Sequence, residues 1–143
     1  MKKFTILLAT IATLFGTSLF TSCSEPESNE PTIVGTWELT ETEDDATLVV
    51  TFVFNADGSG SLTQKYTEGS ASSQMSEMFE YVYNKDTREL FLISESSDFE
   101  LFEEDCKLEA TITANKLKLT IFFYDSYDDE WYNDGSITLT RVK

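Results

Sequence analysis

The acidic residues near the end of the chain are its densest cluster of groups that could bind a ligand. Five carboxylates lie between residues 125 and 134, and carboxylate oxygens are the ligands that Ca²⁺ prefers. The spacing does not match an EF-hand loop, because counting from Asp125 no glycine occupies the sixth position and no glutamate the twelfth. We therefore expect a solvated hairpin tip and no metal site. The weak candidates for metal ligands are Asp125, Asp128, Asp129, Glu130 and Asp134.

The same segment carries aromatic side chains that suit contact with another molecule. Tyrosine and tryptophan are enriched where proteins recognise their partners. Stacking on a sugar or a peptide is one interpretation of these residues, and covering the mouth of a folded domain is the other. The candidate recognition surface consists of Tyr124, Tyr127, Trp131 and Tyr132.

Groups that perform catalysis are scarce. The sequence has no histidine, which excludes imidazole general bases, Ser-His and Cys-His pairs, and the commonest ligand of zinc and copper. Residues 55–60 include two glycines but no lysine, and no helix follows them, so they are typical of a hairpin turn rather than of a phosphate-binding loop. We expect a protein that is not an enzyme and that binds no cofactor.

The net charge limits the partners that the protein can have. The whole chain carries a formal charge of −16. All 26 acidic residues follow Cys23 and two of the ten basic residues precede it, so the chain from Cys23 onward carries 8 − 26 = −18. Such a protein repels nucleic acids and anionic lipid head groups. We expect no nucleic-acid partner, and membrane attachment would require a lipid anchor.

The first residues have the pattern of an export signal. Lys2 and Lys3 precede an uncharged, mainly apolar stretch from residue 4 to 20, and two small residues come directly before Cys23. This order is typical of a secretory signal, and the apolar part is too short and too polar for a comfortable transmembrane helix. Residues 19–23 resemble a lipobox, the processing site of bacterial lipoproteins. The resemblance implies cleavage after residue 22 and attachment of acyl chains to Cys23.

An acidic stalk follows the cysteine. Residues 24–31 contain both prolines of the chain and no large apolar side chain, so they cannot bury enough surface to become ordered. In Gram-negative lipoproteins, serine after the cysteine is compatible with the outer membrane, and early acidic residues resemble a surface-export tag; a solvated linker is the alternative. We therefore expect a signal peptide over residues 1–22 and a lipidated flexible linker over 23–32, with the protein anchored in the cell envelope.

From residue 33 onward, apolar and polar residues alternate in short runs, which is typical of strands buried on one face. Turn signals such as Asp57-Gly58 separate the runs. Roughly eight antiparallel strands in sequence order most simply close into a single up-and-down barrel, and a two-sheet sandwich is the alternative. Residues 68–74 are interpreted as a Gly/Ser-rich loop and 125–134 as a long hairpin tip. The predicted strands span residues 36–42, 48–55, 59–67, 78–84, 88–94, 107–113, 116–124 and 135–142.

Short motifs in this pattern resemble a known family. Gly35-Thr36-Trp37 is similar to the Gly-x-Trp motif of the lipocalins, and Arg141 lies where such barrels carry a basic residue across from the tryptophan. Residues 54–60 resemble the second hairpin of lipocalin-like domains on bacterial lipoproteins. The resemblance covers residues 33–143 and implies an all-β lipocalin-like barrel, closed at one end by a cation–π contact between Trp37 and Arg141. The other lipocalin signature motifs are absent, so both residues are interpreted as structural.

Two functional hypotheses are compatible with these features. The first is a non-enzymatic binding or interaction module on a membrane tether, with a small apolar ligand or an exported protein as its partner. The second is an exported inhibitor or assembly partner that docks through the acidic, aromatic hairpin 125–134. A small barrel can hold a ligand or be filled by its own side chains. The sequence favours a filled barrel, with Phe52, Phe54, Phe79, Tyr81, Phe91 and Phe123 as the candidate fillers.

Overall fold

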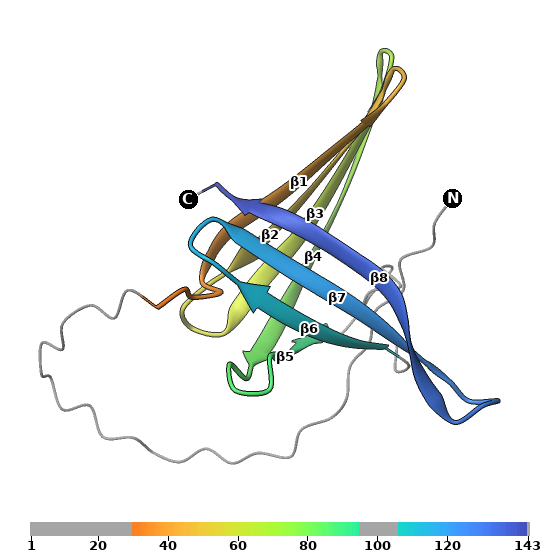
Figure 1. Ribbon diagram of the computed structural model, residues 1–143. Helices are drawn as coiled ribbons and strands as arrows, with labels where there is room; N and C mark the ends of the chain where they lie inside the picture. Colours follow the sequence, from red (N-terminus) through yellow and green to blue (C-terminus); the bar gives the residue numbers. More distant parts are fainter. Residues whose placement is uncertain (1–29, 95–105, 143) are drawn as a thin grey trace, which may run out of the picture.

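The computed structural model describes residues 30–94 and 106–142, which form strands and turns and no helix. The predicted signal peptide, Cys23 and residues 23–29 of the predicted linker lie outside the described residues. Within the described part, therefore, no helix could span a membrane. Figure 1 shows the eight strands wound into a closed barrel. They are β1 (Gly35–Glu43), β2 (Ala46–Phe54), β3 (Ser59–Glu68), β4 (Ala71–Tyr83), β5 (Glu89–Ile93), β6 (Cys106–Ile112), β7 (Lys116–Asp125) and β8 (Glu130–Arg141).

The strands follow one another around the barrel in sequence order. Each pairs antiparallel with the next, and β8 returns to β1. Two residue pairs make this closure, Trp37 with Arg141 and Glu38 with Thr140. The predicted all-β, up-and-down barrel is confirmed, and the sandwich alternative is wrong.

The interior of the barrel is filled by the apolar side chains that alternate along the strands. On β7, for example, Leu117 and Leu119 are fully buried, whereas Lys116 and Lys118 are exposed. The prediction that Phe91 fills the interior is wrong. Its neighbours on β5 point inward, so Phe91 lies on the outer face. The buried cluster consists of Ile33, Trp37, Val50, Phe52, Phe54, Leu62, Phe79, Leu90, Leu92, Cys106, Leu108, Ala110, Leu117, Leu119, Ile121, Phe123 and Leu139.

The two ends of the barrel are built differently. One end, which we call the clamp end, contains the segment around Ile33 and the turns that follow β2, β4 and β6. Arg141 is bonded to that segment there. The opposite end, the hairpin end, carries the β1–β2, β3–β4 and β7–β8 hairpins. Strands β1 to β4 run far beyond the barrel wall there, and the β7–β8 hairpin projects in a different direction (Figure 1). We call residues 39–50 and 64–78 the arm, and residues 124–132 the β7–β8 tip.

Two strands begin at least five residues earlier than the sequence predicts. β4 begins at Ala71 instead of residue 78, so the predicted loop 68–74 is mostly strand. β8 begins at Glu130 instead of residue 135, which shortens the predicted hairpin tip to the turn at 126–129. In both cases the segment pairs with the preceding strand, without interruption on β4 and with one register shift on β8, where Asp134 is skipped between Asn133 and Gly135. Pairing with a strong neighbouring strand outweighs the weak strand propensity of serine, asparagine and aspartate.

Candidate functional site at the hairpin end

Arg141 and Trp37, the predicted structural pair, lie together at the clamp end. The guanidinium carbon of Arg141 is 4.1 Å from the centroid of the Trp37 ring, and Trp37 is fully buried. Arg141 Nε donates to the Ala114 carbonyl over 2.9 Å, in the turn between β6 and β7. A guanidinium over an indole face gains cation–π energy, so this contact joins the closing strand to the core.

The same arginine also holds the chain segment that precedes β1. Its Nη1 donates to the Val34 carbonyl over 2.9 Å and its Nη2 to the Thr32 carbonyl over 2.7 Å. Trp37 Nε1 donates to the Ile33 carbonyl over 2.7 Å. The carbonyls of three successive residues are thereby satisfied, and the Ile33 side chain is only 4 % exposed. Ile33 is thus the first described residue that belongs to the core, and these contacts are structural.

Two tyrosines of β4 complete the clamp end without offering reactive groups. Tyr81 donates from its hydroxyl to the Asn55 carbonyl over 2.7 Å, and Tyr83 donates to the Ala110 carbonyl over 3.2 Å. Burial raises the pKa of both phenols, so they stay neutral at physiological pH. Such groups fix the turns of the clamp end and are poor candidates for acid–base chemistry.

The predicted recognition residues lie on the β7–β8 tip, but on different faces of it. Tyr124 pairs with Trp131, and their ring centroids are 5.3 Å apart. Tyr132 instead packs on Phe123 at 5.8 Å, on the opposite face. Tyr127 belongs to the turn and is 93 % exposed. The structure therefore places Tyr124 and Trp131 together, Tyr132 against the end of the core, and Tyr127 in solvent.

The carboxylates of this tip shape its turn and do not converge. Asp125 Oδ1 accepts a hydrogen bond from the Tyr127 amide over 2.8 Å, and Asp129 accepts one from the Tyr124 hydroxyl. Asp129 has a positive φ of 56°, a conformation that aspartate tolerates in turns. Among the residues that the structure describes, no group of three acidic, cysteine or histidine side chains could hold a metal ion.

The arm carries a second candidate surface, which the sequence analysis missed. Its inner face continues the barrel interior: Leu39 pairs with Val50, and Leu48 pairs with Tyr66 one row further out. Val50 is buried, but Tyr66 is 42 % exposed and Met75, in the same row as Val50, is 48 % exposed. An apolar strip thus runs from the core into solvent.

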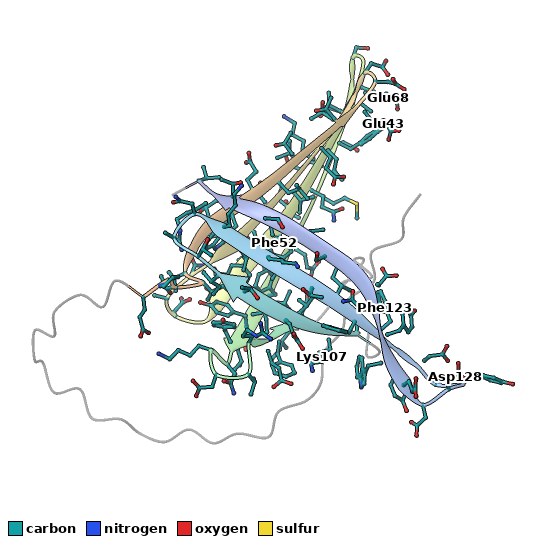
Figure 2. All side chains as sticks on the ribbon, in the orientation of Figure 1. Glu43, Phe52, Glu68, Lys107, Phe123 and Asp128 are labelled. Carbon is teal, nitrogen blue, oxygen red and sulfur yellow. The ribbon has the colours of Figure 1, made fainter. Side chains whose placement is uncertain are left out.

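Carboxylates surround the outer part of this strip. Glu41 lies opposite Leu48, and Glu43 and Glu68 share the outermost row of the inner face. Figure 2 shows Glu43 and Glu68 at the tip of the arm, far from Phe52 in the barrel. We call the residues of β1 to β4 that pair across the strands a row. The four rows on the inner face, from that of Trp37 outward, contain no lysine or arginine. This surface therefore suits a ligand that is both apolar and positively charged.

The tip of the arm is hollowed as well as acidic. Glu68 accepts a hydrogen bond from the Tyr66 hydroxyl over 3.1 Å, and this bond raises the pKa of that phenol. The depression here combines apolar side chains with carboxylates from the β1–β2 hairpin and from β3. Its lining includes Glu41, Glu43, Asp44, Asp45, Leu48, Tyr66 and Glu68.

No protein-family model, no curated protein and no solved structure matches this chain. Function therefore has to be inferred from the geometry of the molecule. That geometry offers a clamp end fixed by Arg141 and Trp37, an interior occupied by an apolar cluster, and two exposed hairpin regions that are rich in carboxylates and aromatic or apolar side chains.

Proposed function

We propose that this protein is a non-enzymatic interaction module, tethered to the cell envelope, that binds an exported protein at its hairpin end. The observation that carries the proposal is the position of Thr32, whose carbonyl is bonded to Arg141 at the clamp end. A tether that precedes this residue leaves from the clamp end. Both exposed hairpin regions therefore lie at the end of the barrel that faces away from the point of attachment.

The proposed tether begins at Cys23, the last residue of the lipobox-like sequence. Thr32 lies nine positions after Cys23, and an extended chain over that interval spans about 30 Å. Acyl chains on Cys23 would hold the barrel close to the membrane, in a Gram-negative cell the outer membrane, with the hairpin end outward. The resemblance to lipocalin-like domains on lipoproteins supports the same assignment.

Surface recognition accounts for the barrel better than transport of a small apolar ligand inside it. The inward side chains of the described strands form one packed cluster that includes Trp37, Phe52 and Phe54. A ligand would have to displace these side chains, and interiors packed in this way lose stability when opened. The exposed aromatics of the β7–β8 tip and the apolar strip of the arm need no such rearrangement.

Charge indicates the kind of partner. The chain carries −16, and the inner-face rows of the arm contain acidic but no basic side chains. Opposite charge accelerates association and makes it sensitive to salt. We therefore propose a positively charged exported protein as the partner and neither nucleic acid nor an anionic membrane surface. The absence of histidine from the sequence supports a role in binding rather than catalysis.

Photo-crosslinking in intact cells tests this proposal directly. A photoreactive amino acid is placed at Tyr127 or Met75 on the hairpin end, and at Asp86 or Asn115, which are exposed at the clamp end, as matched controls. We expect a discrete crosslinked protein of defined mass from the hairpin-end positions only, and less of it at high salt. Crosslinks from the clamp-end positions alone, or from none of the four, would overturn the proposal.

A second candidate restricts recognition to the β7–β8 tip, as in an inhibitor or assembly partner that inserts one hairpin. The exposure of Tyr127 and the contact between Tyr124 and Trp131 favour it. Replacing residues 126–129 by a short Gly-Ser turn distinguishes the two candidates. Loss of the crosslink from Met75 in this variant supports the β7–β8 tip as the only site, and an unchanged crosslink supports the arm.

A further inference from the structure

One long backbone edge of the arm has no strand partner among the residues that the structure describes. β4 pairs with β3 from Ala71 to Glu80, but β5 begins to pair with β4 only at Glu80. Along residues 71–78, no strand in the described part of the chain covers the other side of β4. The side chains from Ala71 to Ser76 are all exposed, and Met78 is 68 % exposed.

The amides on this edge can be identified from the bonds at the base of the strand. The Tyr81 amide donates to the Gly58 carbonyl on the β3 side, and the Asn84 amide donates to the Glu89 carbonyl on the β5 side. Successive residues of a strand direct their backbone groups to opposite neighbours. The amides and carbonyls of residues 72, 74, 76 and 78 therefore point outward from the uncovered edge.

This edge lacks the features that usually prevent strand addition. Exposed edges are normally protected by charged side chains, proline or bulges. Residues 71–76 contain no charge and no proline, although 36 of the 143 residues of the chain are charged, and their pairing with β3 has no bulge. The opposite edge of the arm, on β1, carries Glu41 and Glu43 instead. The uncharged edge is therefore the one suited to accept a strand.

The side chains beside the edge indicate which strand it would accept. A strand added to β4 would place alternate side chains on the inner face, opposite Ser73, Met75 and Glu77. Glu77 carries a carboxylate that already accepts a hydrogen bond from Ser94, and Glu68 on β3 lies opposite Ala71, at the far end of the same edge. Opposite charges placed across neighbouring strands stabilise their pairing. A segment with lysine or arginine near Glu77 and apolar groups near Met75 fits this surface.

We propose that residues 71–78 of β4 bind an extended, positively charged segment of the partner by adding it as a further antiparallel or parallel strand. The inference rests on the proposed function and names the mode of recognition and the chemistry of the partner. Main-chain hydrogen bonds to the four outward residues supply affinity, and the acidic inner face selects a cationic sequence. The β7–β8 tip is not required for this contact.

A synthetic ten-residue peptide in which lysine alternates with valine and threonine is a suitable probe. Its affinity for the full-length protein, purified in detergent, is measured by fluorescence anisotropy, and amide hydrogen exchange is followed residue by residue by NMR. We expect saturable binding that slows exchange at residues 72, 74, 76 and 78. Two peptide controls should not bind, one with glutamate in place of lysine and one N-methylated at alternate backbone nitrogens.

Variants on β4 separate edge pairing from general attraction. Gln74→Pro removes one outward amide and leaves the bonds to β3, so peptide affinity should fall at least about tenfold, equivalent to about 1.4 kcal/mol. Gln74→Thr keeps the amide and should bind as the natural protein does. Glu77→Gln should weaken binding and reduce its dependence on salt. Circular dichroism of each variant checks that the barrel is folded.

Three results would overturn the inference. They are no binding of the lysine peptide, equal binding of the N-methylated peptide, or protection confined to residues outside β4. A dimer that Gln74→Pro converts to monomer, without peptide uptake, would instead assign the edge to a second copy of the chain. If crosslinks arise at the hairpin end while the β4 amides stay unprotected, this inference fails and the proposed function stands. If the β4 amides are protected but no cellular crosslink arises, the proposed function fails and the edge on β4 remains a peptide-binding site.

Discussion

The clamp end and the hairpin end of this barrel use polar side chains in opposite ways. At the clamp end, Arg141 directs its donors at backbone carbonyls of the described chain and covers a buried indole. At the hairpin end, carboxylates and aromatic rings lie in solvent, and Tyr127 is 93 % exposed. The difference indicates that the stabilising contacts are concentrated at one end, and the opposite end is the one that we propose for recognition.

The lengths of the strands explain how one barrel supports both ends. β8 pairs with β1 only at Trp37 and Glu38, so the wall is closed near the clamp and open beyond it. The arm that continues past this point is a four-stranded sheet whose outer rows are wet on both faces. Such a sheet buries little apolar area, and its contribution to the free energy of folding is correspondingly small.

Replacing Trp37 by alanine is expected to have the largest effect. The substitution removes a fully buried side chain, its hydrogen bond to Ile33 and the surface under Arg141. The free energy of unfolding, measured by denaturant titration, should fall by about 3–5 kcal/mol. Trp37→Phe retains a ring and should lose less. A loss below about 1 kcal/mol for the alanine variant would show that the clamp end does not dominate stability.

Arg141→Ala should have the next largest effect on stability. It removes three hydrogen bonds between a charged group and carbonyls, together with the cation–π contact. We expect a loss of about 2–3 kcal/mol in the free energy of unfolding. Faster amide exchange should accompany it at Trp37 and neighbouring residues. Arg141→Lys keeps the charge but not the planar guanidinium, so its stability should lie between those of Arg141→Ala and the natural protein. A lysine variant as stable as the natural protein would contradict this role of the guanidinium.

The turn between β2 and β3 should show a smaller effect that depends on pH. Hydrogen bonds from the Ser59 hydroxyl over 2.6 Å and the Ser59 amide over 2.9 Å lower the pKa of Asp57 below its ordinary value of 3.8. A lowered folded-state pKa stabilises the protein above pH 3.8, and this contribution is lost as the pH falls through the lowered value.

Asp57→Asn should therefore reduce the difference between unfolding midpoints measured at about pH 5 and about pH 2.5. Ser59→Ala should reduce it in the same direction, because it removes the strongest hydrogen bond to the Asp57 carboxylate. The same pH difference in both variants as in the natural protein would show that this turn does not contribute to acid sensitivity.

Tyr127→Ala should have the smallest effect on stability and sharpen the comparison most. Because the side chain lies in solvent, the free energy of unfolding should change by less than about 0.5 kcal/mol. With the photoreactive amino acid placed at the exposed neighbouring residue Asp128 instead, the yield of the cellular crosslink should nevertheless fall. Asn115→Ala, at an exposed position of the clamp end, is the matched control and should change neither quantity. A large loss of stability in Tyr127→Ala would remove the proposed division between the two ends.

Much of the barrel can be predicted from the sequence because its core strands alternate strongly. Leu117, Leu119, Ile121 and Phe123 on β7 all point inward as the pattern predicts. Trp37 and Arg141 could be predicted from the resemblance of two short segments to lipocalins. The structure places their side chains in contact. The alternation lies on one strand and each motif is local, which is the kind of information that a sequence pattern contains, although the contact between the two motifs joins β1 to β8.

The arm could not be predicted in the same way. Three of the six residues 71–76 are serine and apolar residues do not alternate there, and the segment forms a strand because β3 presents a complementary edge. The bonds from Arg141 to Thr32 and Val34 join residues more than 100 positions apart in the chain. Such pairings depend on the completed barrel. The candidate edge on β4 is likewise visible only once the short reach of β5 is known.

The bonds of Arg141 also decide how the molecule would respond to mechanical load. In the tethered protein proposed here, a pull on the stalk meets the two carbonyls held by Arg141 before it reaches β1. The Val142 amide, bonded to the Thr36 carbonyl over 2.8 Å, adds a further attachment near the same point. Since β1 starts at this end and the proposed partner holds the opposite end, the force would act along the axis of the strand. The hydrogen bonds between the strands would then resist together in shear, instead of opening one at a time as in a peeled hairpin.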